Sequence, residues 1–171
     1  MLKTLDKQDF DKMYEILARS FPLDEYRSYE DHKALLDDPH YTVYTCCDGE
    51  DLMGFLAVWE FEAFGFIEHF AVAPRYRNRG LGGRMLKDLA ERLAKQLCLE
   101  VEPPQTSMAC RRIGFYQRNG FYLNDYAYTQ PSLGVGRKEI PLRIMTSGSP
   151  VDQQTFERIR EVLYSNVYNR G

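Results

Sequence analysis

The sequence has little of what marks secreted, membrane-spanning or metal-dependent proteins. It holds only four cysteines and three histidines in 171 residues, and no cysteine pair has the C-x-x-C spacing of a zinc or redox site. No apolar run approaches the roughly 20 residues that span a bilayer, and Met1 to Lys7 lack the apolar core of a signal peptide. We therefore expect a cytoplasmic protein with no metal and no membrane partner. Free, buried thiols are expected at Cys46, Cys47, Cys98 and Cys110.

An excess of positive charge is also missing. The 22 lysines and arginines are outnumbered by 25 aspartates and glutamates, which gives a formal net charge of −3. Proteins that bind nucleic acid usually carry a basic surface, so we expect no nucleic-acid partner. Mild acidity suits a cationic substrate, although only weakly. The length and the 44% hydrophobic content predict a single globular domain over residues 1–171.

The chain does contain an alternation of helical and strand-like patterns. A helical pattern lies between the strand-like residues 66–72 and 97–101, and such a crossover implies that these strands are parallel neighbours. The order of elements predicts a mixed α/β fold with a core of about residues 1–146. Further strands are expected over 41–47, 52–61, 121–129 and 139–145. Helices are expected after Asp6, after Ser28, from Leu81, from Thr106 or Ser107 to Tyr116, and over about 150–167. At the last of these, Ser149-Pro150-Val151-Asp152 combines a capping box with a proline at the first helical position.

One stretch joins a strand, a cationic loop and a helix start. The strand ends at Pro74, and the helical pattern begins among Gly80, Gly82 and Gly83. Glycine lets the backbone approach a ligand closely, and the first amides of a helix attract anions. The stretch therefore predicts a phosphate or pyrophosphate site, with a purely structural turn as the alternative. Neither a P-loop nor a dinucleotide fingerprint fits its spacing. Its arginines are Arg75, Arg77, Arg79 and Arg84.

Three short motifs follow one another along the chain. Val72-Ala73-Pro74 comes first, Arg77-Asn78-Arg79-Gly80-Leu81-Gly82 follows, and Tyr116 with Gly120-Phe121 comes last. In this order they resemble the GNAT family of acetyl-CoA-dependent N-acetyltransferases, whose central motif is Gln/Arg-x-x-Gly-x-Gly/Ala. The resemblance implies acetyl-CoA as the acetyl donor. It also implies a mostly antiparallel central sheet with a parallel, splayed strand pair in the middle and helices on both faces. To these the chain adds a C-terminal helix.

The resemblance also implies which residues hold acetyl-CoA. The edge of Phe70, Ala71 and Val72 is expected to pair with the pantetheine amides like an added strand. Family members often have Asn seven residues and Ala four residues before the tyrosine; Ala109 and Arg112 stand there in this chain, so the usual amide contact is lost. The pyrophosphate is expected on the backbone amides of Arg77, Asn78, Arg79, Gly80, Leu81, Gly82, Gly83 and Arg84.

Acetyl transfer requires a neutral amine, and alkyl amines titrate near pKa 10, so a base must remove a proton. Glu68, an acidic residue within an apolar strand, is the first candidate, because burial would raise its pKa toward a useful range. The alternative is a Glu68 that pairs with an arginine or caps a neighbouring residue; Glu102 and Glu25 are the reserve bases. His69 is expected on the opposite face of the strand, packed in the core.

Tyr116 matches the position of the family's general acid, which would protonate the leaving thiolate. The alternative is a tyrosine that only packs in the core. A backbone amide from the Phe70 to Val72 edge could stabilise the acetyl oxygen.

The acceptor is expected to be a primary amine of a small molecule. Glu25, Tyr26 and Tyr29 could form an acidic aromatic cage for its cation. A peptide N-terminus or a lysine is the rival acceptor, and a non-catalytic CoA-binding module is the rival class. Two roles are open for the C-terminal helix: it covers the core of its own chain, or it forms a homodimer interface.

Overall fold

The computed structural model describes residues 1–168, which fall into two compact units. The first is Met1–Leu97 and the second begins at Cys98. The single domain expected over residues 1–171 stays a prediction. No helix in the described part of the chain is both long and apolar enough to cross a membrane.

The first unit is built on antiparallel strands. β1 (Lys3–Thr4), which the sequence did not predict, pairs with β2 (Tyr41–Asp48), β2 with β3 (Asp51–Glu60), and β3 with β4 (Phe64–Val72). The turn between β2 and β3 places Gly49 at φ +61°, a conformation that glycine adopts without strain. Large apolar side chains of β3 and β4, including Phe55, Trp59 and Phe66, are fully buried.

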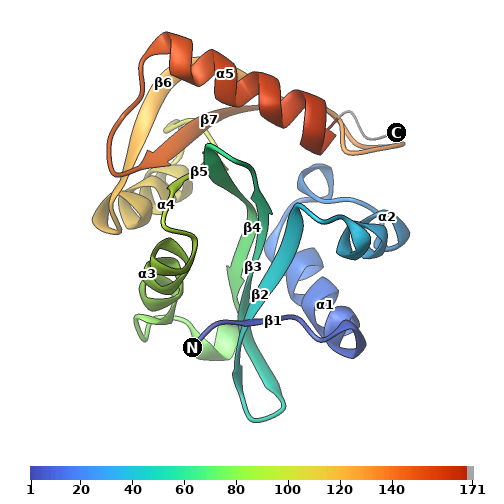
Figure 1. Ribbon diagram of the computed structural model, residues 1–171. Coiled ribbons are helices and arrows are strands. Elements are labelled where there is room, and N and C mark those ends of the chain that lie inside the picture. Colours follow the sequence, from blue (N-terminus) through green and yellow to red (C-terminus); the bar gives the residue numbers. More distant parts are fainter. Residues whose placement is uncertain (169–171) are drawn as a thin grey trace. The chain divides into compact units, whose positions relative to one another are not determined.

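Helices cover both faces of this first set of strands. α1 (Phe10–Ser20) and α2 (Tyr29–Ala34) lie on one face, and α3 (Leu81–Leu93) lies on the other (Figure 1). The apolar stripe of α3 is buried, as its spacing predicts. Ser28 caps α2 by accepting from the amide of Asp31, so the capping signal in the sequence is confirmed.

A β-bulge interrupts β4. His69 is opposite Ala57 and Ile67 is opposite Val58, so Glu68 is an extra residue without a partner on β3. A bulge of this kind re-aims the side chains around it. The side chain of Glu68 is only 3% exposed, although the residue as a whole is partly exposed. The bulge therefore buries the carboxylate and exposes part of the backbone.

In the second unit β7 (Ile140–Ser147) pairs with β6 (Phe121–Gln130) and with the residues of β5 (Gln96–Val101) from Cys98 onward, in both cases antiparallel. The helices are α4 (Ser107–Arg118) and α5 (Gln153–Leu163), which continues into a π-helical turn over Tyr164–Tyr168. The ring of Phe156 on α5 stacks on Tyr126 of β6.

The predicted start of the C-terminal helix at Ser149 and Pro150 is wrong. α5 begins at Gln153, and Asp152 caps it through the amide of Thr155 at 2.8 Å. The preceding residues are held by the strands instead: the Val151 amide donates to Asn124 on β6, and the Ser149 carbonyl accepts from Thr146 on β7. These bonds keep 149–151 out of the helix.

The four cysteines are free, as expected. Cys46 and Cys98 are buried, and Cys47 is half-buried. Cys110 is exposed on α4, which corrects the expectation that all four are buried.

The cap of α4 provides a stability test. Thr106 Oγ1 accepts from the Ala109 amide at 3.1 Å, which resolves the choice between Thr106 and Ser107. We expect Thr106→Ala to lower the free energy of unfolding by about 1 kcal/mol, because an orphan amide loses its acceptor. Ser107→Ala, the control, should stay within about 0.5 kcal/mol. Urea unfolding of both variants measures this, and a larger cost for Ser107→Ala would contradict the assignment.

Candidate functional site

The start of α3 has the geometry of an anion site. Gly80 precedes the helix at φ +73°, and the first helical bond runs from the Arg84 amide to the Gly80 carbonyl at 3.2 Å. The amides of Leu81, Gly82 and Gly83 therefore come before any bond within the helix, where the helix dipole favours negative charge. This arrangement supports the predicted pyrophosphate site.

The arginines of the loop differ in their surroundings. Arg75 is 3.5 Å from the Asp51 carboxylate and lies over the Tyr76 ring. Arg77 donates from Nε to the Val72 carbonyl at 2.9 Å, which ties the loop to the end of β4. Arg79 and Arg84 are exposed, and no carboxylate within residues 1–168 forms an ion pair with either. Their charge is thus available to an anion at the helix start.

The last residues of β4 present backbone to the side away from β3. The Ala73 amide donates to the Met53 carbonyl at 2.8 Å, so Ala73 bonds toward β3. Because antiparallel bonding alternates along a strand, the polar backbone groups of Phe70 and Val72 point to the opposite side. This is the edge that was predicted to bind pantetheine.

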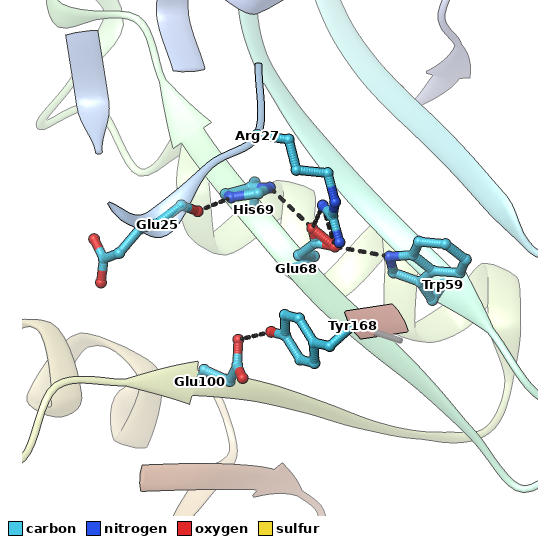
Figure 2. A network of polar contacts seen from close by, with 7 residues as sticks. All are labelled: Glu25, Arg27, Trp59, Glu68, His69, Glu100 and Tyr168. Atoms are coloured by element: carbon cyan, nitrogen blue, oxygen red, sulfur yellow. Dashed lines mark hydrogen bonds and ion pairs between the residues drawn. The ribbon is translucent and has the colours of Figure 1, made fainter. Parts of the chain in front are cut away.

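Glu68 is the centre of a buried polar network (Figure 2). Arg27 contacts both of its carboxylate oxygens, at 3.0 and 2.5 Å. Trp59 Nε1 donates to Oε1 at 2.9 Å. Burial alone would raise the pKa of Glu68, but the charge of Arg27, with smaller contributions from His69 and His32, lowers it to about 2. The expected upward shift of this pKa is therefore wrong, and the alternative of an arginine-paired Glu68 is what the structure shows.

His69 is buried as expected, but it does not lie on the face opposite Glu68. Its Nδ1 is 3.6 Å from Glu68 Oε2, because the bulge breaks the alternation of side chains. Nε2 donates to the backbone carbonyl of Glu25 at 2.6 Å. Burial lowers the pKa of His69, while Glu68 and the Glu25 carbonyl raise it less strongly. A neutral ring at pH 7 follows.

The structure only partly assembles the predicted acceptor cage. Glu25 and Tyr26 lie in the turn after α1, and the Glu25 carboxylate points away from Glu68 and Arg27 (Figure 2). Tyr29 on α2 is engaged elsewhere: its hydroxyl donates to Asp11 at 2.5 Å, and Lys33 lies over its ring. Glu25 and Tyr26 therefore remain the candidates for acceptor binding.

Tyr116 belongs to α4 in the second unit. It is 9% exposed and contacts the rings of Phe115 and Phe121. Burial raises its pKa to about 12, against a small opposing effect of Arg112. Ala109 stands where the family often has Asn, and it is buried, so that amide is absent. Arg112 stands where the family often has Ala, and it adds an exposed cation.

Two sets of residues escaped the sequence analysis. Arg27 carried a signal, since it is an arginine at the end of an acidic aromatic segment, but nothing local pointed to Glu68. In the second unit Glu100 on β5 accepts from Tyr168 of the π-helical turn at 2.6 Å (Figure 2). Glu100 also accepts from Tyr128 on β6 at 2.5 Å, so it joins that turn to both strands. No spacing in the sequence indicates this second group.

Comparison with known proteins identifies the chain. The model of the acetyltransferase (GNAT) family matches residues 10–121. The chain belongs to the GNAT family. It is thus an acetyltransferase, and the resemblance drawn from the three motifs is confirmed.

Individual GNAT relatives extend the match over nearly the whole chain. A solved structure from Bacteroides thetaiotaomicron, named as a member of the GNAT family, is 35% identical with a TM-score of 0.91, covering 100% of this chain and 99% of its own. Bacillus subtilis YjbC, whose name assigns it to the acetyltransferases, is 26% identical over 159 residues, or 91% of this chain and 80% of its own length.

The predicted fold class is confirmed by these findings. Residues 1–168 form a mixed α/β GNAT fold of mostly antiparallel strands with a parallel pair and a C-terminal helix. The splaying of that pair stays a prediction.

Acetyl-CoA is the donor of the GNAT family. A GNAT acetyltransferase from Elizabethkingia anophelis was solved with acetyl-CoA bound; it is 18% identical with a TM-score of 0.60, over 86% of this chain and 96% of its own. This likeness concerns the fold.

The two arginine environments predict different contributions to acetyl-CoA binding. We expect Arg79→Ala to weaken acetyl-CoA affinity about tenfold, or about 1.4 kcal/mol, because a cation beside the phosphates is lost. The loss should shrink at high salt. Arg75→Ala is the matched control and should change affinity less than about twofold, since Arg75 is directed to Asp51 and the Tyr76 ring. Calorimetric titration measures both, and equal losses would contradict the assignment.

Proposed function

We propose that this acetyltransferase moves the acetyl group from acetyl-CoA directly to a primary amine of a small, cationic molecule. The observation that carries the proposal is the acidic aromatic turn that holds Glu25 and Tyr26 and is bonded to β4 by His69. A carboxylate and an aromatic ring are the groups that attract an ammonium ion. β4 is also the strand that leads into the anion site at α3.

The donor is proposed to bind along β4 and the start of α3. The amides of Leu81, Gly82 and Gly83 fit the pyrophosphate, with Arg79 and Arg84 neutralising its charge. The outward backbone of Phe70 and Val72 fits the amides of pantetheine as an added strand. A backbone amide of this edge is proposed to stabilise the acetyl oxygen during transfer.

The proposed proton transfers use groups other than Glu68. Its oxygens already accept from Arg27 and Trp59, and the lowered pKa makes it a weaker base than an ordinary carboxylate. We assign Glu25 to binding the ammonium and to accepting its proton, directly or through water. Tyr116 is proposed to donate its hydroxyl proton to the leaving sulfur, as the family resemblance implies.

A peptide or protein amine is the second candidate acceptor. Structures of this fold carry the names of both kinds of enzyme: the Escherichia coli ribosomal-protein-S18-alanine N-acetyltransferase, 21% identical with a TM-score of 0.66, and the Vibrio cholerae spermidine N-acetyltransferase SpeG, 14% identical with a TM-score of 0.62. At these identities the fold alone is shared, so the choice of a small amine depends on the acidic turn.

An acceptor panel tests the choice. We expect a diamine, a polyamine or an aminosugar to exceed peptides with free N-termini or lysines by at least about tenfold in kcat/KM. Thiol release from acetyl-CoA is the readout. Glu25→Gln should lower kcat/KM for the preferred amine about tenfold or more, and Glu30→Gln, an exposed acidic control on α2, should have little effect. Preference for a peptide, or an unimpaired Glu25→Gln, would overturn the proposal.

The role proposed for Tyr116 leads to a separate prediction about kcat and its pH dependence. Tyr116→Phe should lower kcat about 10²-fold while the KM for acetyl-CoA changes little, because the proton donor acts in the transition state. With its pKa raised to about 12, Tyr116 keeps its proton across the assay range, so no alkaline loss of activity below about pH 11 should come from it. Steady-state rates from pH 6 to 10 check this. A Phe variant with wild-type kcat would refute the role.

A further inference from the structure

We propose that Arg27 and Glu68 are positioning residues that lock the acceptor-binding turn onto the bulge of β4. The turn is defined as residues 22–27, from the end of α1 to the residue before the α2 cap. The inference rests on the proposed function, since it assigns acceptor binding to Glu25 and Tyr26. It adds how these two residues are held and gives Glu68 a role other than that of a base.

Three interactions fix two residues of the turn, Glu25 and Arg27, which flank Tyr26. The Glu25 carbonyl accepts from His69 Nε2 at 2.6 Å. The Arg27 guanidinium contacts both oxygens of Glu68, and the Arg27 carbonyl accepts from the Tyr14 hydroxyl on α1 at 2.9 Å. The backbone on either side of Tyr26 is therefore pinned, and the directions of the Glu25 and Tyr26 side chains depend on these bonds.

The ion pair is shielded from solvent and depends on its partners. The side chains of Arg27 and Glu68 are 8% and 3% exposed. Either charge alone would be buried without compensation, which is strongly unfavourable. Trp59, which is fully buried, holds the Glu68 carboxylate from the β3 side. Arg27 is therefore retained in one position, and with it the end of the turn.

The bulge explains why this anchor lies on β4. Without the extra residue, Glu68 and His69 would point to opposite faces of the strand. With it, both side chains reach the same segment: one binds the Glu25 carbonyl and the other binds Arg27. The acceptor turn and the strand proposed to bind the donor are thus joined as one piece.

A double-mutant cycle tests the anchor. We expect Arg27→Gln and Glu68→Gln each to raise the KM for the preferred amine about tenfold, with acetyl-CoA affinity within twofold and kcat within about fivefold. The double variant should be no worse than either single one, because the two residues act as a pair. Arg19→Gln, which removes an exposed ion pair on α1 with Glu15, is the matched control and should match the wild type.

Several results would overturn the anchor. A drop in kcat of about 10²-fold in Glu68→Gln with a near-normal Arg27→Gln would make Glu68 the base. If the increases in amine KM of the two single variants add up in the double variant, the anchor is also rejected. Loss of acetyl-CoA binding in every variant would reject it as well. If Arg27→Gln fails to fold, Tyr14→Phe removes one anchoring bond alone and should raise the amine KM about threefold; an unchanged KM would count against the anchor.

A second readout keeps the anchor separate from the choice of acceptor. Hydrogen exchange at the amides of residues 23–27 should speed up at least about tenfold in Arg27→Gln and Glu68→Gln but not in Arg19→Gln, while the amides of β3 keep their protection. This measurement needs no substrate. Unchanged exchange overturns the anchor whatever the acceptor is. Faster exchange in an enzyme that prefers peptides would retain the anchor and reject only the proposed small amine.

Discussion

The buried ion pair between Arg27 and Glu68 is the interaction on which the described site depends most. Taking two charges out of water costs free energy that only close, well-oriented contacts recover, and removing one partner of such a pair typically costs about 3–5 kcal/mol. Those contacts come from the Arg27 guanidinium, which binds both carboxylate oxygens of Glu68, and from the Trp59 indole, which donates to one of them. The charge of Arg27 outweighs the effect of burial on the Glu68 pKa. Burial alone would make Glu68 a more basic carboxylate. With Arg27 beside it, Glu68 is instead an anion held in one position.

One strand carries both ends of the proposed chemistry. The bulge of β4 holds the turn with Glu25 and Tyr26, and four residues beyond it Val72 accepts from Arg77 of the cationic loop. The strand therefore links the acceptor turn to the start of α3 within a single unit of the molecule. β4 is packed tightly against β3, because a Cβ added at Gly54 of β3 would lie 2.9 Å from the carbonyl oxygen of Ala71 on β4. A small shift of β4 would therefore displace both the acceptor turn and the start of α3.

Local signals in the sequence were sufficient for much of the fold and for the helix start to which donor binding is assigned by proposal. The Ser28 cap, the helix after Gly80 and the three family motifs each depend on residues within a few positions of one another. The failures have a common cause. The bulge is a property of the register between β3 and β4, and the contacts of Arg27 with Glu68 and of Glu100 with Tyr168 join residues 41 and 68 positions apart. The predicted start of the C-terminal helix was wrong for the same reason, because Asn124 on β6 holds Val151 by a hydrogen bond.

The position of Glu68 shows why an acidic residue in a family strand cannot be assigned a role from its place alone. A carboxylate on a bulge can serve as a base when its surroundings favour the neutral form, and as an anchor when a cation compensates it. Here the deciding residue is Arg27, which reaches β4 from the turn after α1. The same contact that makes Glu68 a poor proton acceptor fixes the turn that carries Glu25. Glu68 is thus held in a structural role, and Glu25 remains the carboxylate that we propose for binding the cationic acceptor.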